Sequence, residues 1–210
     1  IEGDGNEPDI SLVQLDNTNN NFNEIRFLSV GSDDSTRRVG ASFKGIYTTH
    51  SATSPTTDLS FETRNASGIL AERLRINSSG NVGIGVVPEV THSTHDALQV
   101  GGNGVWTSYG SQGASGEMDF QHNAYFAASG NDQYISTDEA TKYRQGGGTH
   151  RFYTAPSGSA DAAITWTQRA RIDSDGLKFN NDSAAANALD DYEEGTHNSA
   201  WTASSSGTIT

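Results

Sequence analysis

The chain has 210 residues, 33% of them hydrophobic, and its 13 basic and 26 acidic side chains give a net charge of −13. This balance argues against nucleic acid binding, which requires a basic stripe, and against binding to anionic membrane surfaces. No apolar run approaches the ~20 residues that cross a bilayer. The absence of Cys excludes disulfides, thiolate metal sites and Cys nucleophiles. An apolar content below the usual ~45–50% favours an elongated assembly, in which chains share thin cores, over a compact globule.

Alternating apolar and polar side chains predict many short β-strands, while frequent Asn, Ser, Thr and Gly disfavour long helices. The expected strands, in chain order, are 10–15, 24–30, 39–47, 58–63, 71–76, 82–86, 97–100, 117–126, 133–136, 140–145, 150–153, 162–172 and 177–180. Short strands separated by turn residues indicate an all-β fold. A short helical turn is expected at 183–187, and the chain from Gly195 onward has the composition of a linker or of the start of another domain.

One short segment of sequence occurs twice, as ERLRINSSGNVGIG at 72–85 and as QRARIDSDGLKFN at 168–180. Apolar residues alternate with Arg73 and Arg75 in the first copy and with Arg169 and Arg171 in the second. An alternation of this kind, followed by Asn, Asp, Ser and Gly, predicts a β-hairpin in each copy. The first turn is one residue longer, so we expect a different register or a bulge in the second hairpin.

The similarity extends upstream, where LSFET at 59–63 resembles HRFYT at 150–154. Each copy is therefore expected to be a module of strand, turn, strand, turn and strand. Pro88 and Glu89 mark the junction between the two copies. We divide the chain into a first β-module at 1–88, a second β-module at 89–182, and an acidic linker at 183–210 that leads to a further domain.

These segments resemble the tail fibre proteins of tailed bacteriophages, particularly those of marine and cyanobacterial phages. The resemblance rests on ERLRINSSGNVGIG, on FYTAPSGSA at 152–160 and on RIDSDGLKFNNDSAAANALDDYEEGT at 171–196, about a third of the chain. Similar sequences have Trp directly after EEGT, whereas here His197 to Ala200 precede Trp201.

The resemblance implies an all-β, intertwined and elongated homotrimeric fibre, located in the virion tail and outside the cell. Its role would be structural, in support of attachment to the host cell surface, without enzymatic activity or a cofactor. The implied partners are two further copies, other virion tail proteins, and a glycan or protein receptor on the host. Alternatives are a capsid decoration or head-fibre protein, a bacterial adhesin stalk, and a tailspike enzyme that degrades polysaccharide. The β-helix repeats of about 20 residues that a tailspike needs are not found.

Two glycines suggest which residues lie near the threefold axis of such a trimer. Gly83 and Gly85 carry no side chain, so the backbones of neighbouring chains could approach them closely. The remaining residues of the expected trimer core are Ile76, Val82, Ile84, Val86, Ile172, Leu177 and Phe179. The four repeat arginines, Arg73, Arg75, Arg169 and Arg171, are expected on the polar strand face, in salt bridges with carboxylates of other chains.

Three aromatic residues, Trp106, Tyr109 and Tyr125, are candidates for stacking on the sugar rings of a receptor, although aromatic residues at strand spacing are more often core. No metal site is predicted. His92 and His95 lie in a polar loop, although three copies could form a ring around an axial metal. The DSDG segment at 173–176 lacks the further ligands of a calcium loop and is typical of a turn.

No residues point to catalysis. The carboxylate pairs 117 with 119 and 138 with 139 are conceivable for glycoside hydrolysis, but nothing in the sequence marks a cleft around them. No Ser-His-Asp arrangement and no Gly-x-Ser-x-Gly motif is present. The acidic cluster at 190–194 favours a solvated linker over a calcium site. The chain is therefore not expected to be an enzyme.

Overall fold

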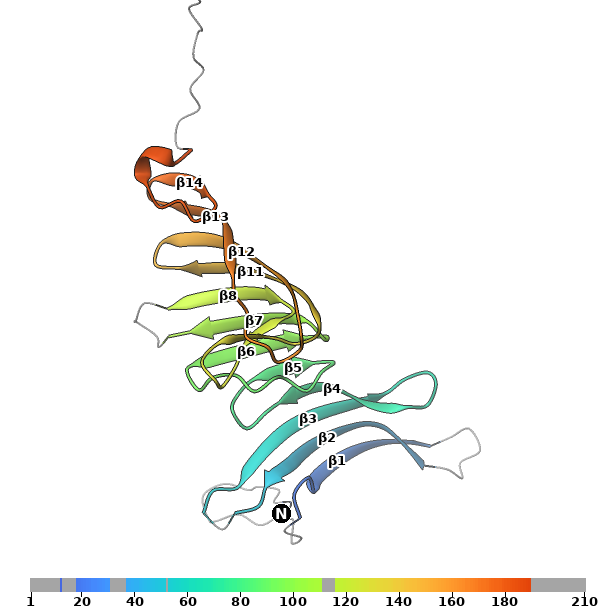
Figure 1. Cartoon of the computed structure of the whole chain (residues 1–210). Helices are drawn as coiled ribbons and strands as arrows, with labels where there is room; N and C mark the ends of the chain where they lie inside the picture. Colours follow the sequence, from blue (N-terminus) through green and yellow to red (C-terminus); the bar gives the residue numbers. More distant parts are fainter. Residues whose placement is uncertain (1–11, 13–17, 31–36, 52, 111–115, 190–210) are drawn as a thin grey trace, which may run out of the picture.

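The computed structural model describes residues 12, 18–30, 37–51, 53–110 and 116–189. These residues form a long, twisted sheet whose strands follow one another like rungs, and no α-helix occurs among them (Figure 1). The prediction of an all-β fold is confirmed. The strand expected at 10–15 and the acidic cluster at 190–194 lie outside the described residues, apart from residue 12.

Twelve strands form one sheet in the order β1-β2-β3-β4-β5-β6-β7-β8-β11-β12-β13-β14, and β9 and β10 form a separate two-stranded hairpin. Their bounds are β1 Phe22–Val30, β2 Arg37–Thr49, β3 Thr56–Arg64, β4 Leu70–Ile76, β5 Val82–Ile84, β6 His95–Val100, β7 Gly104–Tyr109, β8 Glu117–His122, β9 Ala124–Phe126, β10 Asp132–Tyr134, β11 Asp138–Gly146, β12 Thr149–Gly158, β13 Thr167–Asp173 and β14 Gly176–Phe179. A 3-10 turn at Ala185–Asn187 confirms the expected helical turn.

The observed strands differ from the expected ones at three places. Strand β7 was not predicted at all. The expected strand at 117–126 is divided into β8 and β9 because Asn123 adopts a positive φ of 57°, which ends the extended conformation. The strand expected at 162–172 begins only at Thr167.

The sequence repeat corresponds to two sets of four strands, β2–β5 and β11–β14, with the same pairing. Phe61 pairs with Leu74 in the first set, and Phe152 pairs with Ala170 in the second. In both sets the register shifts directly after this pair, so Arg73 and Arg169 lie at equivalent β-bulges. The two sets belong to one continuous sheet, in which the parallel pair β5–β6 joins the first to the strands that follow.

The extra residue of the first turn does not change the hairpin register, contrary to expectation. Ile76 pairs with Val82 in the first hairpin, and Ile172 pairs with Leu177 in the second. The turn itself accommodates the additional residue, because the Asn77 side-chain oxygen accepts hydrogen bonds from two backbone N–H groups of the turn. The strands after both turns therefore present equivalent faces.

Gly83 has a reason within its own chain for lacking a side chain. A Cβ at this position would lie 2.2 Å from the carbonyl oxygen of Val86 and 2.7 Å from Cδ of Pro88, because the segment after β5 folds back over the strand. Gly85 follows β5 with a φ of +71°, a conformation that glycine adopts readily. Val86 lies beyond the strand. Packing within one chain therefore explains Gly83, whereas a Cβ on Gly85 would meet nothing within 4 Å, and the place of Gly85 near a threefold axis stays a prediction.

The hairpin β9–β10 and the segment after β12 cover one face of the sheet at β8, β11 and β12. Ala124, Tyr134, Ala140 and Ala155 form a small buried apolar cluster there, with Ile164 and Trp166 packed against it. We call these two covering segments the cap. The cap leaves the opposite face of the same strands uncovered.

Candidate functional site

One face of the twelve-stranded sheet is apolar along its length, and the strand register places its side chains in matching rows. One row crosses the first repeat, and the equivalent row crosses the second. These rows are Ile25, Phe43, Phe61, Leu74 and Ile84, and Phe120, Tyr143, Phe152, Ala170 and Phe179. A connecting row links them across β3–β7 through Leu59, Ile76, Val82, Leu98 and Trp106. We call these fifteen residues the apolar face.

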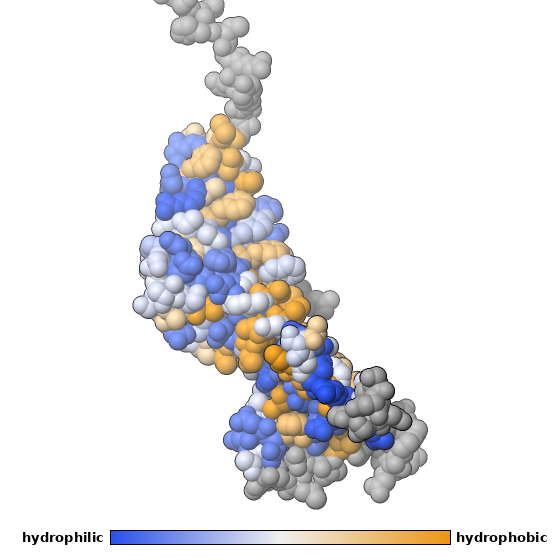
Figure 2. Space-filling model, turned by 90° about the vertical axis from the view of Figure 1, so that its right-hand side faces the viewer, coloured by the Kyte–Doolittle hydropathy of each residue, from blue (hydrophilic) through white to orange (hydrophobic). Residues whose placement is uncertain are grey.

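Much of the apolar face is exposed to water in the single chain. The exposed fractions of Phe61, Trp106, Phe152 and Phe179 are 39%, 53%, 43% and 55%. With aromatic residues of about 150–250 Å² each, these four alone expose roughly 400 Å². A whole monomer rarely exposes an apolar patch larger than about 300–600 Å². Figure 2 shows hydrophobic side chains along one side of the molecule, from the β1 end to the β14 end. A surface of this kind is typical of a protein interface.

The aromatic rings of the second repeat stack from strand to strand across the apolar face. The ring centroids of Trp106 and Phe120 are 5.1 Å apart, those of Phe120 and Tyr143 are 6.0 Å apart, and those of Tyr143 and Phe152 are 4.7 Å apart. In the first repeat, Phe43 and Phe61 form the pair equivalent to the last of these, at 4.8 Å. Cross-strand pairs of this kind fix the positions of the rings before any partner binds.

The opposite face of the sheet carries charged side chains that are paired within the chain. In the first repeat, Arg75 lies 2.9 Å from Asp58 and 2.6 Å from Glu72, and Lys44 lies 2.7 Å from Glu62. The hydrogen bond with Glu72 raises the pKa of Arg75, although burial opposes the shift. For Glu62, burial raises the pKa, but the hydrogen bonds with Lys44 and Ser42 outweigh it and lower the pKa overall.

The second repeat places its charges in the same way. Arg144 lies 2.7 Å from both Asp119 and Glu117, and the hydrogen bond with Asp119 raises its pKa against the effect of burial. This arginine therefore occupies the carboxylate pair that was considered for glycoside hydrolysis. The other pair, Asp138 and Glu139, is exposed at the start of β11.

Two aspartates of the DSDG turn pair with a lysine of the same chain. Lys178 Nζ lies 3.0 Å from Asp173 Oδ1 and 2.7 Å from Asp175 Oδ2. The backbone N–H of Asp175 and the Lys178 ammonium lower the pKa of Asp173. This arrangement agrees with the interpretation of the segment as a turn. No group of three His, Cys, Asp or Glu residues that could hold a metal occurs in the part of the chain that the structure describes.

All four repeat arginines have partners within their own chain. Arg75 pairs with Asp58 and Glu72, as described above, and Arg171 Nε lies 2.6 Å from Asp173 Oδ2. The bulge residues Arg73 and Arg169 donate hydrogen bonds to the hydroxyls of Thr63 and Thr154 at 3.0 and 2.9 Å. The charges of Arg75 and Arg171 are thus neutralised before any association. A contact of Arg73 and Arg169 with carboxylates of another chain stays a prediction.

The three proposed receptor residues do not form one platform. Trp106 belongs to the apolar face, whereas the alternation along β7 places Tyr109 on the opposite face. Tyr125 is only 7% exposed, and its hydroxyl donates a hydrogen bond to Gln133. Unlike the receptor candidates, four of the expected core residues lie together on the apolar face: Ile76, Val82, Ile84 and Phe179. Ile172 and Leu177 pair on this same face, one row further along.

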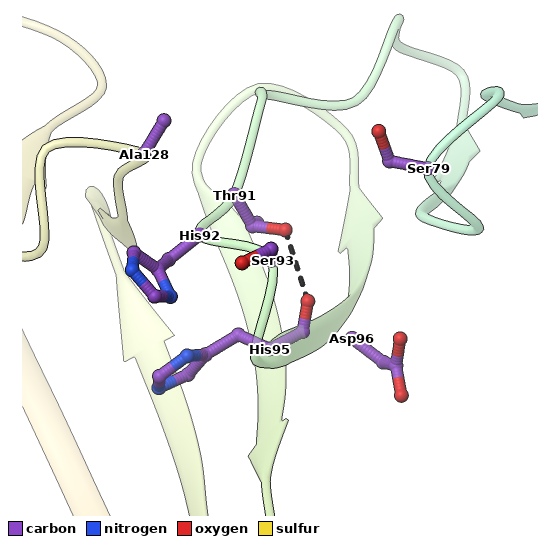
Figure 3. A pocket seen from close by; sticks show the side chains of 7 residues that line it. All are labelled: Ser79, Thr91, His92, Ser93, His95, Asp96 and Ala128. Carbon is purple, nitrogen blue, oxygen red and sulfur yellow. Dashed lines mark hydrogen bonds between the residues drawn. The ribbon is translucent and has the colours of Figure 1, made fainter.

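A polar hollow of about 440 Å³ lies where β5 passes into β6, and Figure 3 shows His92 and His95 on one side of it. His95 stacks on Phe126 and Tyr109, with ring centroids 4.1 and 5.0 Å apart. Both imidazole Nδ1 atoms lie within hydrogen-bond distance of the Thr94 hydroxyl, at 2.8 and 2.9 Å. Burial, followed by the neighbouring His92, lowers the pKa of His95. The hollow links the first repeat to the hairpin β9–β10.

Comparison with models of protein families, with curated proteins and with solved structures found no match for this chain. Among the described residues, no helix has the length and apolar character needed to cross a membrane.

Proposed function

We propose that the chain is a non-enzymatic virion structural protein, a segment of a homotrimeric tail fibre that supports attachment to the host cell surface. The observation that carries this proposal is the apolar face, which crosses all twelve strands of the sheet and lies opposite the face that the cap covers in the described part of the chain. An elongated shape and an exposed apolar surface along its whole length are the properties that a shared fibre core requires.

The kind of partner follows from the chemistry of the apolar face. Its three rows contain no charged side chain, and the two repeats present equivalent residues at equivalent positions. Copies of the same chain, placed side by side and in register, would bring apolar rows together at every level of the sheet. The charged groups of the opposite face are already paired within each chain, so they would not need a partner from another copy.

Association would also explain the composition. A chain with few hydrophobic residues can bury a large apolar area if three copies contribute one face each, because the core then belongs to the assembly. Three copies of each weak surface contact would act together, so attachment would depend on avidity instead of on one strong site.

The first test is the mass of the chain in solution, measured by light scattering during size-exclusion chromatography. We expect three times the chain mass of 22.3 kDa, with early elution from an elongated particle. A monomer that stays soluble at high concentration would contradict the proposal, and a dimer would replace the threefold arrangement by two facing sheets. Antibody labelling of virus particles in electron micrographs then tests the location, since labelled heads would favour a decoration protein.

A further inference from the structure

One buried ion pair of the second repeat lies between the sheet and the cap. Lys142 on β11 points its ammonium group at Asp132 of the cap, with Nζ 2.5 Å from Asp132 Oδ2. A second carboxylate, on Asp119 of β8, has its Oδ2 3.6 Å from the same nitrogen. The exposed fractions of the three side chains are only 3%, 8% and 9%. An amine and two carboxylates therefore share a site that water hardly reaches.

Aromatic rings and neutral donors complete this site. The Lys142 ammonium lies 4.7 Å from the ring centroid of Trp166 and 5.5 Å from that of Tyr153. Trp166 Nε1 donates a hydrogen bond to Asp132 Oδ2 at 2.6 Å, and Gln121 Nε2 donates one to Asp132 Oδ1 at 3.2 Å. Each oxygen of Asp132 thus has its own neutral donor.

Another lysine of the same chain provides a comparison. Lys178 is equally buried and pairs with Asp173, but its second carboxylate, Asp175, is 41% exposed. Its aspartates belong to a surface turn, and no aromatic ring lies over its ammonium group among the described residues. Lys178 therefore has the usual surroundings of a lysine in a turn, whereas Lys142 has a closed site around the carboxyl carbon of Asp132.

We propose that Lys142 and Asp132 join in a spontaneous isopeptide bond that ties the cap to the sheet. A buried lysine and aspartate in contact can exchange a proton, because the neutral amine and acid lose less hydration than the ions. The proton passes from Nζ to Oδ2, and the free amine attacks Cγ. The developing charge on Oδ1 is stabilised by the Gln121 amide, in the manner of an oxyanion site.

Asp119 completes the reaction as a base. Its Oδ2 lies 3.6 Å from Nζ, so the Asp119 carboxylate is placed to accept the second proton from Nζ and pass it to Asp132 Oδ2. Oδ2 then leaves as water, next to the Trp166 donor, and the C=O bond re-forms at Oδ1. One N–C bond forms, one C–O bond breaks, one water is released, and Asp119 is restored. The step requires no oxidant, reductant or cofactor.

The test is the mass of the purified 210-residue chain, measured after denaturation. We expect it to be lower than the sequence mass by one water molecule. A protease that cuts after Glu separates Asp132 from Lys142 at Glu139, so the two resulting peptides should remain joined. Trypsin should also fail to cut at Lys142, while it cuts at Lys178.

Two variants distinguish the isopeptide bond from other losses of water, such as cyclisation at the Asp175–Gly176 sequence. Lys142→Arg keeps a cation in the site but cannot form the amide, so its mass should equal the sequence mass. Asp119→Asn should form the link much more slowly, or not at all, with folding of both variants checked by circular dichroism. The wild-type chain at its full sequence mass after prolonged incubation would overturn the proposal, and so would a water loss that persists in Lys142→Arg. Neither result depends on the oligomeric state.

Discussion

Replacement of Trp106 by Ala is expected to dissociate the proposed trimer while leaving the fold of the single chain intact. Trp106 is the last residue of the connecting row, next to Phe120 in the middle of the apolar face, and 53% of it is exposed in the single chain. For a Trp of roughly 250 Å², that fraction is about 130 Å². At ~25 cal/mol per Å², covering it stabilises the assembly by about 3 kcal/mol per chain.

Three chains together would lose about 9 kcal/mol, or about six orders of magnitude in the dissociation constant of the trimer. Within the single chain, the replacement removes mainly the edge-to-face contact with Phe120, a loss of about 1 kcal/mol. The oligomeric state should therefore change much more than the monomer fold. Sedimentation velocity over a wide range of chain concentrations measures the oligomeric state, and circular dichroism monitors the fold of the single chain.

Val90→Ala is the matched control, because Val90 is 62% exposed but lies in the loop between β5 and β6, outside the apolar rows. It should dissociate at the same concentration as the wild-type chain. The reasoning would be refuted if Trp106→Ala and Val90→Ala left the trimer equally stable, since the centre of the apolar face would then be outside the interface.

Three further predictions concern the fold of each chain. Gly83→Ala should lower the free energy of unfolding by about 1–3 kcal/mol, because its Cβ would overlap the Val86 carbonyl. An unchanged thermal midpoint would contradict the packing of Val86 and Pro88 against Gly83. Arg75→Ala should lower the free energy of unfolding by about 3 kcal/mol, because it leaves two partly buried carboxylates without a cation. Arg73→Ala removes one hydrogen bond to a hydroxyl and should lower the free energy of unfolding by only about 0.5 kcal/mol. Chemical denaturation of both variants measures the difference, and equal losses would contradict the assigned pairs. Burial and His92 lower the pKa of His95 below its ordinary value of 6.5. Below pH 6.5 the unfolded chain therefore binds more protons than the folded chain. The free energy of unfolding then decreases as the pH falls toward the lowered pKa. Denaturation at a series of pH values should show this loss in the wild-type chain and a smaller one in His95→Phe; the same slope in both would exclude His95 as its source.

The sequence predicted most of the strands, because alternation with a period of two is a local property of the chain. It also predicted the repeat, which the structure shows as two sets of four strands with the same pairing and the same bulge. Strand β7 was missed, because Gly102 and Asn103 precede it and Gly104 begins it, and this run suggests a longer turn. The left-handed conformation of Asn123, which separates β8 from β9, has no signal beyond the identity of the residue.

The candidate site depended more strongly on tertiary structure. The apolar residues Ile76, Val82, Ile84 and Phe179 were grouped correctly, because strand alternation alone places them together. The role of Gly83 was misjudged, since the segment that fills its space is not paired with β5 and leaves no periodic signal. Lys142 was not singled out at all, because Asp132 and Trp166 come to it from two separate parts of the cap.

The sequence by itself thus determined the strands, the turns and the two unlike faces of the sheet, because these depend on residues that are neighbours along the chain. Only the tertiary structure decided which face is covered by the cap and which is left open. The cap and the fold-back of Pro88 depend on contacts between distant residues, and these contacts cover the charged face. Apolar rows along the other face therefore remain available for a partner.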